Sequence, residues 1–238
     1  LWKPDEDIYA NSAIKNFADT IAKNYGIQID EYQDLWKWSI NEKEKFWSTL
    51  LHFLGIKYSG NIDPVITNDE LIYDQKFFPN ISLNYAENII LNLNNTPIIF
   101  INEKGFRQEI TREEIIAKVS SLSSYLRSIG IKKGDRVAAI SANTPNTLIS
   151  FLSVNSIGAV WSSCSPDFGE AAILDRFNQI EPKVLLYSEI YFYGGKKFNI
   201  KERVSNIIRE IKTLEKSLCI NYQDSKEEQI KNDVIDLL

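Results

Sequence analysis

The densest group of potential ligand-binding residues is the segment WSSCSPDFG at residues 161–169. It joins a buried apolar segment to an amphipathic one, which predicts that it leaves a parallel strand and begins a helix at Asp167. Ligands bind at this edge of open α/β sheets, and a helix N-terminus there offers N–H groups to an anion. Asp167 could equally be an N-cap, in a capping-box variant that ends at Glu170. The candidate ligand-edge loop consists of Trp161, Ser163, Cys164 and Asp167.

The sequence gives little support for catalysis by a cysteine nucleophile, by a histidine or by a zinc site. Cys164 has no base beside it in the sequence, and a reactive thiolate needs a lowered pKa. The one histidine, His52, lies in an apolar segment and is expected at the margin of a buried helix. One histidine and two cysteines, Cys164 and Cys219, are too few for a structural zinc site of the Cys/His type. We therefore assign no catalytic residue and no metal ligand.

The usual phosphate-binding loops are missing from the sequence. It contains neither G-x-x-x-x-G-K-[ST] nor G-x-G-x-x-G. Residues 194–197, with the sequence GGKK, have two interpretations. Their N–H and ammonium groups could bind an anion, or the segment could be an exposed turn, which we favour.

Composition sets the broad class. The chain has 238 residues, 44% of them apolar and 25% charged, with a net charge of −5. These values are typical of a globular protein with one large or two small domains. The acidic balance argues against a nucleic-acid partner, and no apolar run reaches the length of roughly 18–20 residues that a membrane span needs. Two cysteines without a signal peptide favour a cytoplasmic location.

Strands and helices alternate through the second part of the chain. Strands are predicted at 98–101, 136–141, 159–163, 184–187 and 218–220, and helices at 112–129, 146–157, 167–180 and 204–214. Such alternation indicates βαβ units with right-handed crossovers. The fold class is therefore α/β: a helical N-terminal segment followed by an incomplete, mostly parallel sheet with flanking helices.

The first part of the chain is helical and rich in aromatic residues. Helical spacing predicts helices near 13–25, 30–38 and 43–54. Capping boxes at Ser39–Glu42 and Thr111–Glu114 predict two helix starts. The tryptophans at 36, 38 and 47 could line a ligand groove, but large aromatic side chains more often pack in a core.

Three segments are expected from these patterns. Residues 1–95 form a helical segment, and residues 96–222 form the first α/β portion of a larger domain. Residues 223–238 are highly charged and are predicted to be a polar linker, with the domain incomplete where the sequence ends.

Two adjoining motifs carry a family resemblance. GAVWSSCSPDFG at 158–169 and LDRFNQIEPKVL at 174–185 resemble the acetoacetyl-CoA synthetases, within the adenylate-forming acyl-CoA synthetase superfamily. Similarity extends to LWKP at 1–4, to Tyr32–Ser39 with Phe46-Trp47, to FFP at 77–79 with LNYAEN at 83–88, and to Ile110–Glu114.

The resemblance implies the N-terminal portion, with AMP-binding domain, of an ATP-dependent acid–CoA ligase. Such a ligase converts acetoacetate and Mg-ATP into acetoacetyl-AMP and pyrophosphate, and CoA then displaces AMP. In relatives the phosphate loop, the adenine- and Mg²⁺-contacting motifs and a catalytic lysine come later in the chain. We therefore expect these residues alone to be inactive, to bind ATP, Mg²⁺ and CoA only weakly, and to need the remainder of the polypeptide.

Two groups of candidate CoA-binding residues follow from the resemblance. In relatives the loop that matches Phe78, Pro79 and Asn80 lies near the CoA adenine. Basic residues at the start of the helix near 112 help to hold the CoA phosphates, which makes Arg112 a candidate. A plain surface cation explains Arg112 equally well.

Two alternatives to this function are open. One is a ligase of the same class for another short acid, such as acetate or a short branched acid. The other is a non-catalytic binding module that retains half of a ligase fold.

Overall fold

The structure is a computed structural model that describes residues 5–68, 71–93, 97–220 and 222. The chain divides into two compact units, Leu1–Leu83 (unit 1) and Asn84–Leu238 (unit 2). We describe each unit by itself. The predicted linker at 223–238 lies outside the described residues.

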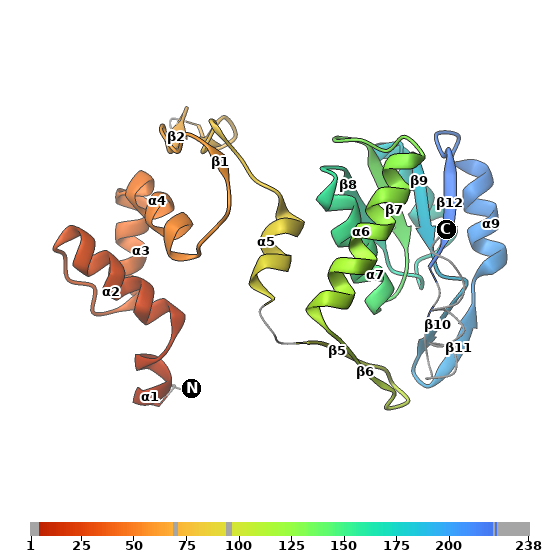
Figure 1. The fold of residues 1–238 in the computed structure, drawn as a ribbon, viewed down its shortest axis with the longest axis horizontal. Helices are drawn as coiled ribbons and strands as arrows, with labels where there is room; N and C mark the ends of the chain where they lie inside the picture. The colour runs from red at the N-terminus through yellow and green to blue at the C-terminus, as the bar shows by residue number, and fades with distance from the viewer. Residues whose placement is uncertain (1–4, 69–70, 94–96, 221, 223–238) are drawn as a thin grey trace. The chain divides into compact units, whose positions relative to one another are not determined.

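Unit 1 consists of helices followed by two small antiparallel β-ladders (Figure 1). The helices are α1 (Glu6–Ala10), α2 (Ala13–Tyr25), α3 (Tyr32–Asn41) and α4 (Lys43–Phe53). The strands are β1 (Ser59–Gly60), β2 (Ile66–Thr67), β3 (Lys76–Phe77) and β4 (Ile81–Ser82), in which β1 pairs with β4 and β2 with β3.

An aromatic core joins α2, α3 and α4. Phe17 lies 5.8 Å from the ring of Phe46 and 5.0 Å from that of Phe53. Trp38 packs against the same cluster, whereas Trp36 and Trp47 are 47% and 37% exposed. Core packing therefore explains Trp38, and Trp47 packs at the margin of the core, with its ring 5.4 Å from that of Phe46 and 5.1 Å from that of Phe77.

One of the two predicted capping boxes is wrong. Ser39 lies inside α3, where its hydroxyl donates to the carbonyl oxygen of Trp36 at 2.7 Å. A serine within a helix can bond back to its own helix, so Ser39 does not start a new one. The capping box at Thr111 is confirmed, because Thr111 Oγ1 accepts from the N–H of Glu114 and the Glu114 carboxylate accepts from the N–H of Thr111.

Unit 2 is an α/β unit. Its helices are α5 (Tyr85–Asn92), α6 (Arg112–Ser128), α7 (Pro145–Ser156), α8 (Glu170–Ile180) and α9 (Lys201–Glu210). Its strands are β5 (Ile98–Ile101), β6 (Arg107–Ile110), β7 (Arg136–Ile140), β8 (Val160–Cys164), β9 (Val184–Tyr187), β10 (Ile190–Tyr193), β11 (Lys196–Asn199) and β12 (Lys216–Cys219).

The main sheet has four strands in the order β12-β9-β7-β8, and all neighbours are parallel. The chain leaves β7 toward β8 on one side and returns to β9 on the other. Right-handed crossovers then place α7 on the opposite face from α8 and α9. Figure 1 shows α6 and α7 together in front of the sheet and α9 away from them. The predicted parallel sheet with flanking helices is therefore confirmed.

The side chains of β7 alternate between two hydrophobic clusters. Val137 and Ala139 pack with α6 and α7, and Ala138 and Ile140 pack with α8 and α9. All four are fully buried, as expected for a central parallel strand covered on both faces.

Helix α5 belongs to the compact unit that begins at Asn84, whereas the sequence analysis places residues up to 95 in the helical segment. Ala86 is buried in a cluster with Ile115 and Leu152, from α6 and α7. The Asn84 side chain donates to the carbonyls of Asn155 and Ser156, at 2.9 and 3.1 Å. These contacts attach the helix to α7.

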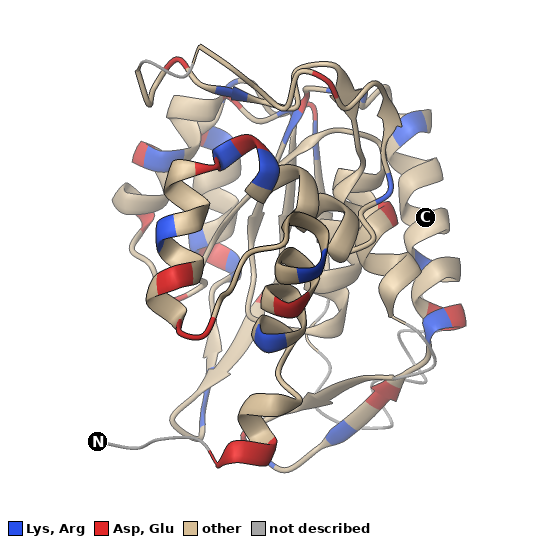
Figure 2. Cartoon of the chain, turned by 90° about the vertical axis from the view of Figure 1, so that its left-hand side faces the viewer, with Lys and Arg blue, Asp and Glu red and all other residues tan. Residues whose placement is uncertain are grey.

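The surface carries mixed charges. In the view of Figure 2, basic and acidic residues alternate along the helices and do not separate into regions of one sign. Within the described ranges, no helix is both long and apolar enough to cross a bilayer.

A charged cluster lies at the amino ends of the main strands. Asp135, only 6% exposed, precedes β7, and its carboxylate lies 3.0 Å from Lys183 Nζ at the start of β9. The N–H of Lys132 donates to the same carboxylate at 3.0 Å. Burial alone raises the pKa of Asp135, but these two contacts outweigh burial and lower it.

Asp135 should therefore stabilise the protein at neutral pH. A lowered folded-state pKa adds stability above the unfolded-state pKa, about 3.9, and the gain is lost as pH falls through the folded value. Asp135→Asn should lower the free energy of unfolding at pH 7 by about 1–2 kcal/mol, and the deficit should shrink below about pH 4. Urea unfolding at both pH values measures it.

Glu215→Gln is the matched control, because Glu215 is exposed and lies 3.9 Å from the same Lys183 ammonium. It should change the free energy of unfolding by less than about 0.5 kcal/mol. Equal stability of Asp135→Asn and the unsubstituted protein at pH 7 would contradict the assignment.

Candidate ligand site at the carboxyl edge of the sheet

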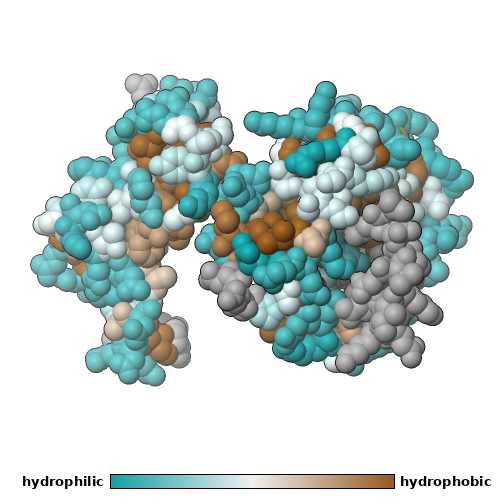
Figure 3. Space-filling view, in the orientation of Figure 1, coloured by the Kyte–Doolittle hydropathy of each residue, from teal (hydrophilic) through white to brown (hydrophobic). Residues whose placement is uncertain are grey.

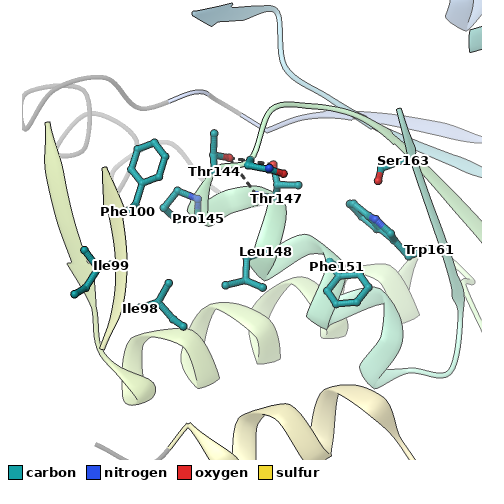
Figure 4. Close-up of a pocket in the computed structure, with 11 residues that line it drawn as sticks. Ile98, Ile99, Phe100, Thr144, Pro145, Thr147, Leu148, Phe151, Trp161 and Ser163 are labelled. Atoms are coloured by element: carbon teal, nitrogen blue, oxygen red, sulfur yellow. Dashed lines mark hydrogen bonds between the residues drawn. The ribbon is translucent and has the colours of Figure 1, made fainter. Parts of the chain in front are cut away.

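A cavity of about 370 Å³ opens beside the carboxyl ends of β7 and β8 (Figure 4). Its lining is mainly apolar, with polar groups from the loop after β7 and from β8. The lining residues are Ile98, Ile99, Phe100, Asn143, Thr144, Pro145, Thr147, Leu148, Phe151, Trp161 and Ser163. They come from β5, from the loop before α7, from α7 itself and from β8. We call this cavity the edge pocket.

The start of α7 is held by a network of hydroxyl groups. Thr144 is the N-cap and accepts from the N–H of Thr147 at 3.3 Å, and Pro145 occupies the first helical position. Thr147 Oγ1 donates to the carbonyl of Ala142 at 2.7 Å and lies 3.2 Å from Ser141 Oγ. Capping and the fixed φ of proline preorganise this helix start. These contacts define the start of α7 beside the edge pocket.

Strand β8 supplies the opposite wall through alternate residues. Trp161 and Ser163 face the pocket, and Trp161 stacks edge-on against Phe151 at 6.0 Å. Phe151 in turn contacts Tyr85 of α5 at 5.7 Å. Figure 4 shows Trp161 and Phe151 next to each other, with Ser163 further along β8. Two of the four predicted ligand-edge residues thus lie at one pocket.

Cys164 lies on the other face of the sheet. It is 5% exposed and packs in the cluster of α8 and α9, as strand alternation requires. Burial raises the pKa of its thiol, and the nearby charge of Arg176 offsets this only in part. A buried, protonated thiol is a poor nucleophile. Cys164 is therefore a core residue and lines no part of the edge pocket.

Asp167 does not begin a helix. Helix α8 starts at Glu170, with Gly169 as its N-cap and without a side-chain cap. Asp167 instead accepts a hydrogen bond from Ser165 Oγ within the turn after β8, and its side chain is exposed. The predicted helix start at Asp167 is wrong because residues 166–168 form a turn before the helix. Asp167 stays a candidate by its position at this edge.

The Gly194-Gly195 pair is a hairpin turn whose N–H groups bind a carboxylate of the same chain. It joins β10 to β11, and both glycines have positive φ, at 58° and 73°. Their N–H groups donate to the two oxygens of Glu103, at 3.0 and 2.9 Å. Both interpretations of the segment are thus partly correct. It is an exposed turn, and its N–H groups bind an anion, the carboxylate of Glu103 in the β5–β6 hairpin.

The loop at 78–80 belongs to unit 1 and is held by two hydrogen bonds to residues earlier in that unit. The N–H of Phe78 donates to the carbonyl of Val65 at 2.7 Å, and the side chain of Asn80 donates to that of Asp63 at 2.8 Å. A Cβ on Gly60 would lie 2.2 Å from the carbonyl oxygen of Asn80, so only glycine fits beside this loop.

Arg112 belongs to unit 2, at the start of α6. Its Nε donates to the carbonyl of Ile90, in the last turn of α5, at 3.2 Å. This contact gives the guanidinium a structural role that does not need a ligand. Its remaining N–H groups are available for other partners.

Most of the residues that line the edge pocket are not among the candidates predicted from the sequence. Asn143, Thr144 and Thr147 follow a predicted strand, and the Thr-Pro pair at 144–145 is the usual signature of a helix start. That signal could have placed the α7 N-terminus at the same sheet edge as Ser163. The contribution of Phe100 from the hairpin had no comparable signal. In the part of the chain that the structure describes, no cluster of three or more acidic, His or Cys side chains could hold a metal ion.

The chain is similar to known proteins in sequence and in fold. A family profile described as AMP-binding enzyme matches residues 93–236. The chain is 35% identical to the acetoacetyl-coenzyme A synthetase of Rhizobium meliloti over 89% of its length, and 32% identical to the acetoacetyl-CoA synthetase of Macaca fascicularis over 95%. It is also 30% identical to malonamoyl-CoA synthetase vrtB of Penicillium aethiopicum, over 89%.

A solved structure shares the fold. The acetoacetyl-CoA synthetase from Streptomyces lividans matches 94% of this chain with a TM-score of 0.87 and 30% identity. The chain spans about a third of the curated relatives that it matches, 32% of the Rhizobium protein and 34% of the Macaca protein. Because the profile covers more than half of the residues, this chain belongs to the AMP-binding enzyme family.

Proposed function

We propose that the protein containing this chain is an acid–CoA ligase that forms acetoacetyl-CoA from acetoacetate, ATP and CoA through an acyl-adenylate. One observation carries the proposal: the acetoacetyl-CoA synthetases match this chain almost end to end, in sequence and in fold. The whole reaction would release AMP and pyrophosphate. Mg²⁺ would accompany ATP as a substrate partner, and the location would be the cytoplasm.

The residues of this chain would form a scaffold and one wall of the substrate site. Strand β8 pairs with β7, and the N-terminus of α7 follows β7 in the chain, so that both line the edge pocket. Its largely apolar lining would exclude water next to a reactive acyl-adenylate. The hydroxyl network at Thr144 and Thr147 would keep the helix start rigid. No residue of the chain is proposed as catalytic.

The relatives also favour a particular class of acid. Acetoacetate and malonamate are both short acids with a carbonyl group on the β-carbon, and they differ by a methyl against an amino group. Since synthetases named for each of them match this chain, a short 3-carbonyl acid is the substrate class that fits both. Acetate lacks that carbonyl and serves as the contrast.

Acid-dependent release of AMP by the full-length protein tests this proposal. With ATP, Mg²⁺ and CoA present, acetoacetate should give the highest kcat/KM among acetoacetate, malonamate, acetate, propionate and butyrate. The preference over butyrate should be at least about tenfold, which corresponds to about 1.4 kcal/mol for a recognised carbonyl group. AMP and the acyl-CoA product are measured together.

Other outcomes would change the proposal in defined ways. Preference for malonamate or acetate would refute acetoacetate and retain the ligase reaction. Folded protein that releases no AMP with any acid would refute the ligase and favour a non-catalytic binding module.

We further propose that Phe78, Pro79, Asn80 and Arg112 contribute to CoA binding. Arg112 supports this by charge, since it has further N–H donors beside the one bound to Ile90. The firm hydrogen bonding of Phe78 and Asn80 within unit 1 gives that loop a defined surface.

Arg112→Ala should raise the KM for CoA severalfold and leave the KM for ATP unchanged, because a lost contact to a CoA phosphate affects only CoA. Arg127→Ala, in the last turn of the same helix, is the control and should change neither constant. Steady-state kinetics with varied CoA measures the effect. A CoA dependence that matches that of the unsubstituted protein would refute the role of Arg112.

A further inference from the structure

Arg203 of α9 reaches across unit 2 to the turn that follows β8. Its NH1 donates to the carbonyl oxygen of Phe168 at 2.8 Å, and its NH2 donates to that of Pro166 at 2.5 Å. Both hydrogen bonds are donated by a charged guanidinium, which strengthens them. Because the guanidinium is planar and rigid, it fixes the directions of the two acceptors relative to each other. One side chain therefore sets the orientation of two peptide groups in the turn.

Further contacts hold the same turn. The guanidinium of Arg176, on α8, lies 4.9 Å from the centre of the Phe168 ring. The ring of Pro166 is buried, while Asp167 and Phe168 are exposed beside it. Glu170, which begins α8, accepts from the side chain of Asn206 at 3.4 Å. Side chains of α8 and α9 thus both contact the turn, and we call this set of contacts the clamp.

The clamp has a consequence for the exposed side of the turn. In a planar trans peptide the C=O and the N–H point in opposite directions. Since the carbonyls of Pro166 and Phe168 point at Arg203, the N–H groups of Asp167 and Gly169 point away from it. Arg203 thereby determines where two backbone donors are aimed at the carboxyl edge.

The place of the turn makes that orientation functionally relevant. It directly follows β8, whose Trp161 and Ser163 line the edge pocket. Ligands of open α/β sheets bind outside the carboxyl ends of the strands. We propose that Arg203 is a positioning residue, which fixes the turn at 165–169 in the conformation that meets a substrate. This inference rests on the proposed function, because it needs a substrate at this edge.

Arg203→Ala and Arg203→Lys in the full-length protein test the proposal, with Arg209→Ala as the matched control. Arg209 lies on the same helix and is exposed, its side chain donates to Asn206 Oδ1, and among the described residues it makes no contact with the turn at 165–169. Three quantities are measured: amide hydrogen exchange at 165–169, kcat and KM for ATP, CoA and acetoacetate, and the midpoint of thermal unfolding.

We expect Arg203→Ala to exchange faster at 165–169 and to raise KM for at least one of the three substrates by about tenfold, with kcat within about twofold. Added guanidinium ion should restore part of that KM, because it can occupy the vacated position. Arg203→Lys should give an intermediate KM, since a lysine makes one such contact where arginine makes two. Arg209→Ala should match the unsubstituted protein.

Unchanged exchange at 165–169 in Arg203→Ala would overturn the proposal. So would faster exchange with all three KM values unchanged, since the turn would then be fixed without serving a substrate. If Arg203→Ala does not fold, Arg176→Gln, which removes the contact to the Phe168 ring, should show the same pattern more weakly. Unsubstituted protein without ligase activity on any acid would refute the proposed function instead, while the exchange measurement would still decide whether Arg203 fixes the turn.

Discussion

Strand β7 is the element on which the rest of unit 2 depends. It is hydrogen-bonded on both edges, to β8 and to β9, and its side chains alternate between the two hydrophobic clusters of the unit. Complete burial of its larger side chains, Val137 and Ile140, contributes about 1.5–3 kcal/mol each. Because β7 and β8 are parallel, the loops that follow them lie at the same edge of the sheet. The strand order changes direction at β7, with β8 on one side and β9 on the other. The edge pocket follows from that arrangement.

The two ends of the strands in the main sheet carry different groups. At the amino edge, Asp135 and Lys183 join the starts of β7 and β9 in a charged contact that serves stability. At the carboxyl edge, hydroxyl groups and aromatic rings line the edge pocket, and the turn that follows β8 is held by hydrogen bonds from Arg203. On the face of the molecule in Figure 3, hydrophobic surface is exposed among hydrophilic residues in unit 2. The charged contact and the edge pocket thus lie at opposite ends of the strands.

The strands of the main sheet could be predicted because continuous apolar runs such as Val137–Ile140 have one reasonable environment, a sheet covered on both faces. The exact start of α8 could not, since the turn before it contacts Arg203, a residue far away in sequence. The hairpin at 190–199 was missed, although a Gly-Gly pair between strand-like segments is a strong hairpin signal. The edge pocket joins three separate segments, so its shape is a tertiary property.

The most direct test of this account is hydrogen exchange of the full-length protein with and without its substrates, ATP with Mg²⁺, acetoacetate and CoA. The account predicts that bound substrates slow exchange at 141–147 and 161–169, around the edge pocket and its turn. The amino edge at 132–136 should stay unchanged. Slower exchange elsewhere, with neither carboxyl-edge segment affected, would contradict a substrate site at this edge of the sheet.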